Sequence, residues 1–286
     1  QKRGGVGVVD LDTKEEDFIT MLISARTHSD LLFFSDKGKA YQIKMYDIPE
    51  GRRATKGKSI MNFISLGSDE KVTSILAMPK ETKGMTLSLA MVTRQGVVKK
   101  VSAESFKDVR RSGLIAIKLS GGDELLSSLF VEKGDEIILA TAQGQAIRFK
   151  ESDVREMGRA AGGVRGMKLR KNDKIIGADV VKKSYNKPTL LVMGENGYGK
   201  KTPITEYKIQ HRGGSGIKTA KVNAKIGNLI AAKVVTETEE ELVAISKKSQ
   251  VIRTDLNSVP SLGRQTQGVK IMKPRPGDSL ASLIVM

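Results

Sequence analysis

Apolar and polar residues follow one another along this chain in a pattern that recurs five times. An apolar run is followed by a short polar turn and then by a second, partly apolar run. The runs are rich in β-branched residues and most of the turns contain glycine, which is the sequence pattern of a β-hairpin. The five hairpins are predicted to turn near Gly38, Gly96, Gly144, Gly197 and Ser249.

A basic loop that contains glycine follows each hairpin and leads into a further strand. A sixth loop of the same kind, QKRGGVGVVDL, opens the chain. The loops recur at a spacing of about 50 residues, which is typical of a protein built from repeated small sheets. Aligning one glycine from each loop gives Gly5, Gly57, Gly113, Gly163, Gly214 and Gly268.

A third segment, an apolar run after a polar turn, closes each repeat and occurs six times, from residues 18–25 to residues 280–286. Repeats of about 50 residues with four short strands predict an all-β, propeller-like closed array. Six basic loops and six closing runs predict six blades. Because there are only five hairpins, one blade is expected to share strands from both ends of the chain. No break in composition divides the array, so we expect one domain over residues 1–286.

The chain has a net charge of +17, whereas a magnitude of about 2–8 is enough to keep a small domain soluble. The excess predicts a polyanionic partner, either nucleic acid, an anionic membrane surface or an acidic protein. The sequence contains no basic amphipathic helix, which argues against the membrane. Aromatic residues make up only 4% of the chain, which disfavours base stacking with single strands. Double-stranded DNA is the partner that these observations favour, and an acidic protein stays open.

Basic loops at a regular spacing can follow a duplex, which carries about one negative charge per 1.7 Å of its axis. Glycine allows successive backbone N–H groups to form an anion-binding nest beside the cations. Bending about 40 bp through roughly 180° costs around 10 kcal/mol, so several such patches are needed. We therefore predict wrapping with weak sequence preference. Outside the first loop, the candidate DNA-binding residues are Arg52, Arg53, Lys56, Lys58, Arg110, Arg111, Arg159, Arg165, Arg212, Lys218, Arg264 and Lys270.

Four further cations lie four residues after the hairpin turns, and these either contact DNA or face the next repeat. They are Lys100, Arg148, Lys201 and Arg253.

Candidate chemistry is sparse. The chain has no cysteine and only two histidines, His28 and His211, which excludes thiolate metal sites and disfavours a zinc site. The absence of cysteine fits a reducing compartment. The segment GENGYGKKT resembles a phosphate-binding P-loop, but Lys201 replaces the Ser/Thr that binds magnesium, and the repeats place it in a hairpin turn. No catalytic residues, metal or cofactor are expected in this chain.

The first seven residues, QKRGGVG, together with the repeats, resemble the C-terminal domain of DNA gyrase A. That family has a Gln-basic-Arg-Gly-Gly-basic-Gly box, and Val6 departs from it because the family usually has lysine there. The segments HRGGSG and KKTPITEY support the resemblance. The box residues that match are Gln1, Lys2, Arg3, Gly4, Gly5 and Gly7.

The resemblance implies a six-bladed β-pinwheel that wraps double-stranded DNA for negative supercoiling, with the box closing the wrap. It implies a non-catalytic, monomeric domain that works with the remainder of gyrase A and with gyrase B. The parent type IIA topoisomerase would use ATP and Mg²⁺ elsewhere, in the bacterial cytoplasm at the nucleoid. Two alternatives stay open: the matching DNA-binding domain of topoisomerase IV, and a propeller-type protein-interaction module with a basic rim.

Overall fold

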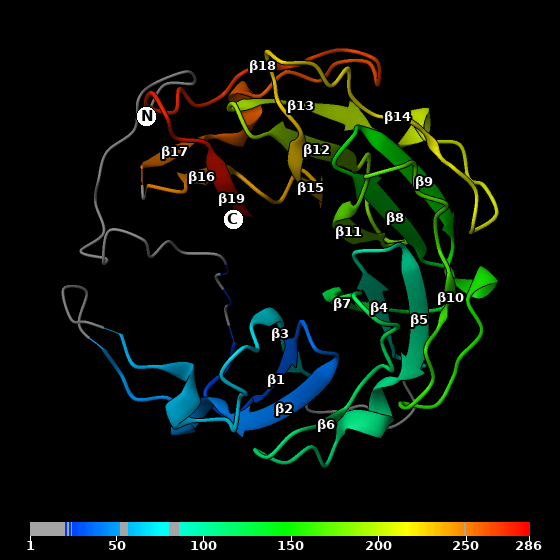
Figure 1. The fold of residues 1–286 in the computed structure, drawn as a ribbon, viewed down its shortest axis with the longest axis vertical. Helices are drawn as coiled ribbons and strands as arrows, with labels where there is room; N and C mark the ends of the chain where they lie inside the picture. Colours follow the sequence, from blue (N-terminus) through cyan, green and yellow to red (C-terminus); the bar gives the residue numbers. More distant parts are fainter. Residues whose placement is uncertain (1–20, 22, 24, 52–56, 80–85, 249) are drawn as a thin grey trace. The chain divides into compact units, whose positions relative to one another are not determined.

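The structure is a computed structural model. It shows β-strands and short 3-10 helices, as the sequence pattern predicts (Figure 1). Within the part of the chain that it describes, no helix is long and apolar enough to cross a membrane. The described residues are 21, 23, 25–51, 57–79, 86–248 and 250–286.

The described chain forms two compact units. The N-terminal unit consists of Ile23–Asp135 and Lys150–Gly166, and the C-terminal unit includes Glu136–Phe149 and Met167–Met286. The boundary falls inside the third repeat, because its hairpin belongs to the C-terminal unit and its basic loop belongs to the N-terminal unit.

The N-terminal unit contains two antiparallel four-stranded sheets (Figure 1). The first sheet has the order β3-β1-β2-β6 and consists of β1 (Asp30–Ser35), β2 (Lys39–Lys44), β3 (Val72–Met78) and β6 (Leu114–Ile115). The second sheet has the order β10-β5-β4-β7 and consists of β4 (Ser88–Thr93), β5 (Val97–Ser102), β7 (Leu125–Val131) and β10 (Val164–Arg165).

The C-terminal unit contains three sheets. The third sheet has the order β11-β8-β9-β14 and consists of β8 (Glu136–Thr141), β9 (Gln145–Lys150), β11 (Ile175–Val181) and β14 (Ile217–Lys218). The fourth has the order β15-β12-β13-β18 and consists of β12 (Thr189–Gly194), β13 (Tyr198–Pro203), β15 (Leu229–Val235) and β18 (Val269–Lys270). The fifth has the order β17-β16-β19 and consists of β16 (Glu241–Ser246), β17 (Val251–Asp255) and β19 (Leu280–Val285).

Short 3-10 helices connect the hairpins to the basic loops, and one more lies within a loop. They are η1 (Met45–Asp47), η2 (Ile60–Asn62), η3 (Ala103–Phe106), η4 (Glu151–Asp153), η5 (Ile204–Glu206) and η6 (Leu256–Ser258).

The prediction of an all-β protein built from repeated small sheets is confirmed, but the prediction of six blades is wrong. The described residues form five sheets, and each sheet is built on one of the five hairpins. A hairpin supplies two long, paired strands, whereas a basic loop supplies an edge strand of two residues and a closing run supplies the other edge. Counting loops and closing runs therefore overestimated the number of sheets, because a sheet needs the hairpin as its centre. The first loop, residues 1–11, lies outside the described residues.

Each four-stranded sheet takes its last strand from the following repeat. In the first sheet, β6 comes from the loop after the second hairpin and pairs with β2, with Ile115 opposite Lys39. The same exchange joins β10 to β5, β14 to β9 and β18 to β13. Strand sharing is thus a property of every four-stranded sheet, where the sequence had suggested it for one blade only.

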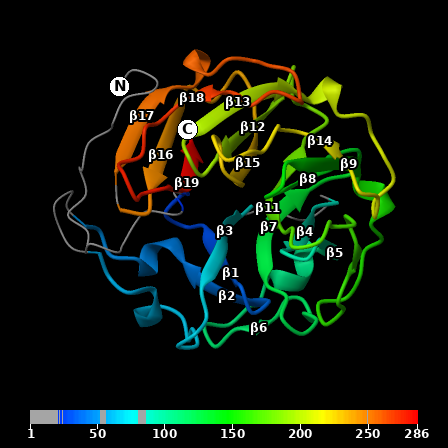
Figure 2. The same cartoon turned by 45° about the horizontal axis from the view of Figure 1, so that its top comes forward.

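Neighbouring sheets within each unit bury their apolar faces against one another. In the N-terminal unit, Phe34 of the first sheet packs edge-to-face on Phe106 with ring centroids 5.8 Å apart. The closing strands β3 and β7 are in contact there, and in the C-terminal unit β15 lies between β11 and β19 (Figures 1 and 2). Since the closing strand forms one edge of each four-stranded sheet, the strand from the basic loop forms the opposite edge.

Candidate nucleic-acid interface

The edge strands from the basic loops contain only two residues each, an apolar residue followed by one that faces solvent. Alternate side chains of a strand point to opposite faces, so the apolar residue packs on the core and its neighbour points away. The outward residue is a cation in three of the four edge strands: Arg165 in β10, Lys218 in β14 and Lys270 in β18. In β6 it is Ile115, which is 58% exposed. All three cations had been predicted as DNA-binding residues.

A glycine with positive φ precedes each of these edge strands. A side chain there would collide with the hairpin strand: a Cβ atom at Gly216 would lie 2.4 Å from the carbonyl oxygen of Ala146. The sequence alignment had chosen Gly214 in this loop, and that choice is wrong by two residues because HRGGSG offers three glycines that spacing alone cannot separate. The four glycines are Gly113, Gly163, Gly216 and Gly268, with φ of 81°, 89°, 70° and 80°.

Sequence reasoning missed a recurring lysine three residues after each edge strand. All four of these lysines are exposed, and among the described residues none forms an ion pair. The backbone N–H of three of them, Lys118, Lys168 and Lys221, donates to a carbonyl of the next basic loop at 2.8–3.2 Å, which holds the main chain of these three lysines in place. The signal was present in the sequence as AIKL, GMKL, TAKV and IMKP. The residues are Lys118, Lys168, Lys221 and Lys273.

The other predicted residues are undescribed, exposed or half-buried. Residues 1–7, 52, 53 and 56 lie outside the described residues. Lys58, Arg110 and Arg159 are exposed. Arg111 is exposed but pairs with Asp47, with 2.5 Å between guanidinium and carboxylate, which neutralises part of its charge.

The remaining two predicted arginines are half-buried, and one of them links two loops. Arg212 lies in the basic loop after the fourth hairpin, and Arg264 lies in the basic loop after the fifth. The guanidinium of Arg264 donates to the carbonyl oxygen of Lys218 at 3.0 Å. The structure therefore brings Arg264 and Lys218 together from consecutive loops.

An aromatic ring contacts two lysines, one in β18 and one in the turn before β15. The Nζ of Lys270 lies 4.5 Å from the ring centroid of Tyr198, which is its cross-strand partner, and the Nζ of Lys225 lies 5.3 Å from the same centroid. Cation–π attraction at an exposed site stabilises such contacts by about 0.5–1 kcal/mol. Tyr198 therefore holds two cations beside β18.

Three of the four cations that follow the hairpin turns bind the next repeat, whereas Arg253 pairs with Glu241 of its own hairpin. Lys100 pairs with Glu151, and the guanidinium of Arg148 donates to two carbonyl oxygens around η5 at 2.9 and 3.0 Å. Lys201 donates to the carbonyl oxygen of Leu256 at 3.0 Å. Each of these three side chains thus caps a 3-10 turn of the next repeat, which favours the second of the two roles considered for them.

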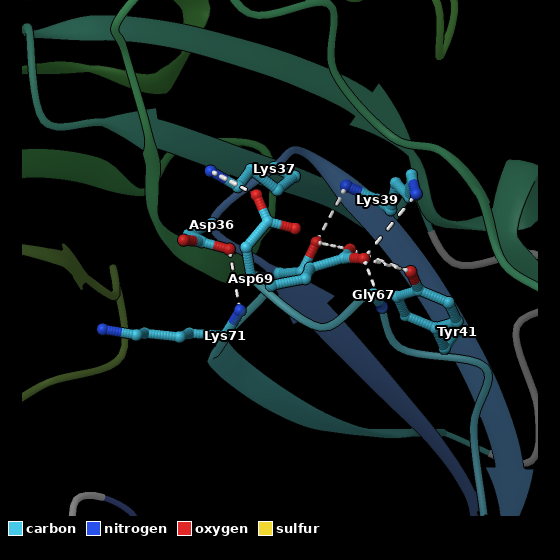
Figure 3. Close-up of polar contacts among 9 residues, drawn as sticks. Asp36, Lys37, Lys39, Tyr41, Gly67, Asp69 and Lys71 are labelled. Carbon is cyan, nitrogen blue, oxygen red and sulfur yellow. Dashed lines mark hydrogen bonds and ion pairs between the residues drawn. The ribbon is translucent and has the colours of Figure 1, made fainter. Parts of the chain in front are cut away.

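A buried carboxylate, that of Glu70, binds several groups of the first sheet. Figure 3 shows three of its neighbours, Lys39, Tyr41 and Gly67. Glu70 accepts hydrogen bonds from the hydroxyls of Ser35 and Tyr41 and from the N–H of Gly67 at 3.0 Å, and the ammonium of Lys39 lies 3.6 Å away. Burial acts to raise the pKa of Glu70, but these hydrogen bonds outweigh it and lower that pKa. Burial and the neighbouring Glu70 raise the pKa of Tyr41. Glu70 is therefore ionised and Tyr41 protonated at neutral pH.

The Tyr41 ring lies directly beneath the glycine that precedes β6. A Cβ atom at Gly113 would be 2.4 Å from its Cε1 atom. Lys71 N–H donates to Asp36 at 2.8 Å in the same turn region (Figure 3). This cluster thus positions a loop, and its groups already have partners within the protein.

The remaining candidate sites from the sequence are a metal site, the P-loop-like segment and His28. In the described part of the chain, no three His, Cys, Asp or Glu side chains are grouped to hold a metal ion. The P-loop-like segment forms the turn between β12 and β13, with Gly197 at a φ of 79°, so the prediction of a hairpin is confirmed. The ring of His28 contacts Tyr46, with centroids 6.1 Å apart.

Repeated hairpin sheets that exchange edge strands define a propeller-like repeat protein. The family described as "DNA gyrase C-terminal domain, beta-propeller" matches this chain over six segments. The chain therefore belongs to this family. The matched segments are residues 1–24, 29–77, 88–132, 135–182, 188–236 and 240–285.

Individual relatives agree with this assignment. The DNA gyrase A protein of Staphylococcus epidermidis is 38% identical over 99% of this chain, and the chain spans 31% of that protein's length. A solved structure of a DNA gyrase A C-terminal domain has a TM-score of 0.85 and 30% identity, and the match covers 100% of this chain and 92% of that one. The C-terminal domain of a DNA topoisomerase IV has a TM-score of 0.82 at 22% identity over 96% of this chain and 84% of that one, which shows a shared fold.

Proposed function

We propose that this chain binds duplex DNA along its basic edge strands and wraps it, largely independently of base sequence. One observation carries the proposal: exposed lysines recur at the same position after the edge strand in successive repeats. Lys118, Lys168, Lys221 and Lys273 occupy equivalent positions, and Arg165, Lys218 and Lys270 precede three of them by three residues. Cations that recur at equivalent positions of successive repeats suit a polymer of phosphates better than a single small anion.

The proposed contacts are to the DNA backbone. The described residues contain no α-helix that could enter the major groove, and Tyr198 is engaged by two lysines. Arginine, lysine and backbone N–H groups bind phosphates whatever the base sequence. Specificity would arise from how easily the DNA bends.

Within a whole enzyme, the domain would act as the non-catalytic DNA-wrapping part of a type IIA topoisomerase. The relatives are DNA gyrase A proteins, and this chain spans about a third of their length. We extend the role to it: the wrap presents a neighbouring DNA segment for passage and gives negative supercoiling. The partners would be the remainder of gyrase A and gyrase B, in the cytoplasm at the nucleoid. ATP and Mg²⁺ would act outside this domain, and the box at residues 1–7 would close the wrap.

Two other functions compete with this one. The fold is shared with a topoisomerase IV C-terminal domain, so the chain could bend DNA within that enzyme instead. A protein-interaction module with a basic rim would bind acidic proteins and leave DNA topology unchanged. The linking number of the DNA therefore distinguishes wrapping from a protein-interaction module.

The test is to ligate nicked plasmid in the presence of the chain and to measure the linking number. The wild type is expected to shift the linking number in proportion to bound protein. The variant K118Q/K168Q/K221Q/K273Q is expected to lose the shift, because four phosphate contacts disappear. The matched control K133Q/K182Q/K233Q/K247Q removes four exposed lysines elsewhere and should keep most of it.

An unchanged linking number at saturating wild-type protein would reject wrapping. Equal losses in both variants would show that net charge, and not the recurring row, binds the DNA.

A further inference from the structure

Two lysines are completely buried at equivalent positions in the second and fourth sheets. Lys99 and Lys200 are each the third residue after a hairpin-turn glycine, and they are 0% and 1% exposed. Lysine is almost never fully buried unless its ammonium group is paired. Burial lowers the pKa of each to about 8. An ammonium group held at this cost in two repeats needs a structural explanation.

Both ammonium groups donate to backbone carbonyls in the basic loop of the next repeat. The Nζ of Lys200 lies 2.6 Å from the carbonyl oxygen of Gly263 and 2.7 Å from that of Arg264. The Nζ of Lys99 donates to the carbonyl oxygen of Arg159 and, at 2.8 Å, to that of Ala116. Arg159 and Arg264 occupy equivalent turns, so the two lysines perform the same task.

An inward carbonyl fixes the direction of the next N–H. In a planar trans peptide the C=O and N–H bonds point in opposite directions. Because the carbonyls of Arg159 and Arg264 point inward to a lysine, the N–H groups of Ala160 and Gln265 point outward. Both residues are exposed, and neither N–H has an acceptor among the described residues.

The following N–H group in each turn is used internally. Ala161 N–H donates to the carbonyl oxygen of Gly158 at 3.1 Å, and Thr266 N–H donates to that of Gly263 at 3.2 Å. Each turn therefore offers one outward N–H, immediately after an arginine, and closes on itself with the next. An outward N–H beside a guanidinium suits a phosphate oxygen.

We infer that Lys99 and Lys200 are positioning residues for DNA binding: they hold the turns at Arg159–Ala160 and Arg264–Gln265 so that one backbone N–H and one arginine meet a phosphate of the duplex. This inference rests on the proposed function, and it names where two of the phosphates bind. The lysines themselves do not touch DNA, since they are buried.

The third sheet provides a natural contrast. Ile147 stands at the equivalent position and is fully buried without a polar group. The basic loop after the fourth hairpin approaches this side chain, since a Cβ atom at Gly214 would lie 3.5 Å from the Cδ1 atom of Ile147. The chain thus contains loops with and without this support, and a substitution at Ile147 serves as a matched control.

The first experiment uses the wild-type chain and amide NMR shifts during titration with duplex DNA. The amide protons of Ala160 and Gln265 are expected to move downfield as phosphate binds, and those of Ala161 and Thr266 to move much less because they are bonded internally. Saturating DNA binding without movement at Ala160 and Gln265 would overturn the inference. No binding by the wild type would remove the proposed function as well, so the two failures are distinguishable.

The second experiment compares K99M, K200M and the control I147M. Each lysine variant is expected to bind DNA about tenfold more weakly, the loss of one charge-assisted contact. The slope of log K against log salt should become shallower by about 0.9 for each phosphate lost. Amide hydrogen exchange in the turn after the substituted lysine should speed up, and I147M should match the wild type in all three measurements.

A merely structural role for the lysines would lower the unfolding midpoint but leave the salt slope unchanged, and that result would overturn the inference. The wild-type NMR titration keeps it testable if a lysine variant fails to fold.

Discussion

The first and fourth sheets share one topology, but they present different surfaces. Both consist of a hairpin, a closing strand and an edge strand from the next repeat. The outward residue of the edge strand is Ile115 in the first sheet and Lys270 in the fourth. The difference teaches that the hairpin determines the sheet, while one or two edge positions determine what that sheet can bind.

The support beneath the loop differs in the same two sheets. Tyr41 occupies the third position after the turn in the first sheet and is held by the buried Glu70, whereas Lys200 occupies it in the fourth. The ring of Tyr41 fills the space under Gly113, while the ammonium of Lys200 binds carbonyls. One loop is held by packing and the other by charge, so substitutions should affect them differently.

The largest effect is expected from filling the space above Tyr41. G113A adds a methyl group 2.4 Å from the ring at a φ of 81°, and left-handed strain plus overpacking should lower the free energy of unfolding by about 2–4 kcal/mol. The control G121A has no atom within 4 Å of the new methyl group. Urea unfolding measures both, and equal midpoints would show that the loop does not rest on Tyr41.

Exchanging the outward residues of the edge strands should change the salt dependence of DNA binding by about one phosphate contact. I115K gives the first sheet the cation that it lacks and should steepen the slope of log K against log salt by about 0.9, while K270I should flatten it by a similar amount. The control M286K adds the same charge beyond the closing strand β19. If I115K and M286K changed the slope equally, position on the edge strand would be irrelevant.

Stability should also depend on pH. Burial lowers the pKa of Lys99 and Lys200 from 10.5 to about 8, so between these values the unfolded state binds more protons than the folded state. Stability should therefore rise with pH from about 8 towards 10.5. The raised pKa of Tyr41 acts in the opposite direction above pH 10, because the folded state then retains its proton.

Unfolding midpoints at pH 7.5, 8.5 and 9.5 measure this dependence. In K99M/K200M the rise attributed to the lysines should disappear, and a rise of equal size in that variant would assign it to other groups.

Much of the architecture could be predicted from local pattern. The turns at Gly38, Gly96, Gly144 and Gly197 were recognisable because each needs a positive φ that glycine adopts easily. The number of sheets was not predictable from the loops, because a two-residue edge strand such as β18 pairs with a hairpin far back in the chain. The order of apolar and polar residues within one repeat does not show which strand of another repeat it pairs with.

The candidate interface was predicted in part. Arg165, Lys218 and Lys270 could be found because they adjoin a glycine loop. Lys200 could not be distinguished from Lys201 in GYGKKT, although one is buried beneath a loop and the other caps a 3-10 turn. Which of two adjacent lysines faces inward depends on strand register, and register is set by partners in the next repeat.

Strand exchange also determines how mechanical load travels through the molecule. A pull on Lys270 acts on β18, which pairs with β13 through only two residues, Tyr198 and Gly199. The peptide chain carries the same load forward into the fifth repeat, while the hydrogen bonds carry it back into the fourth hairpin. Tension applied at one edge strand is thus divided between two consecutive repeats, and the short ladder is the element that yields first.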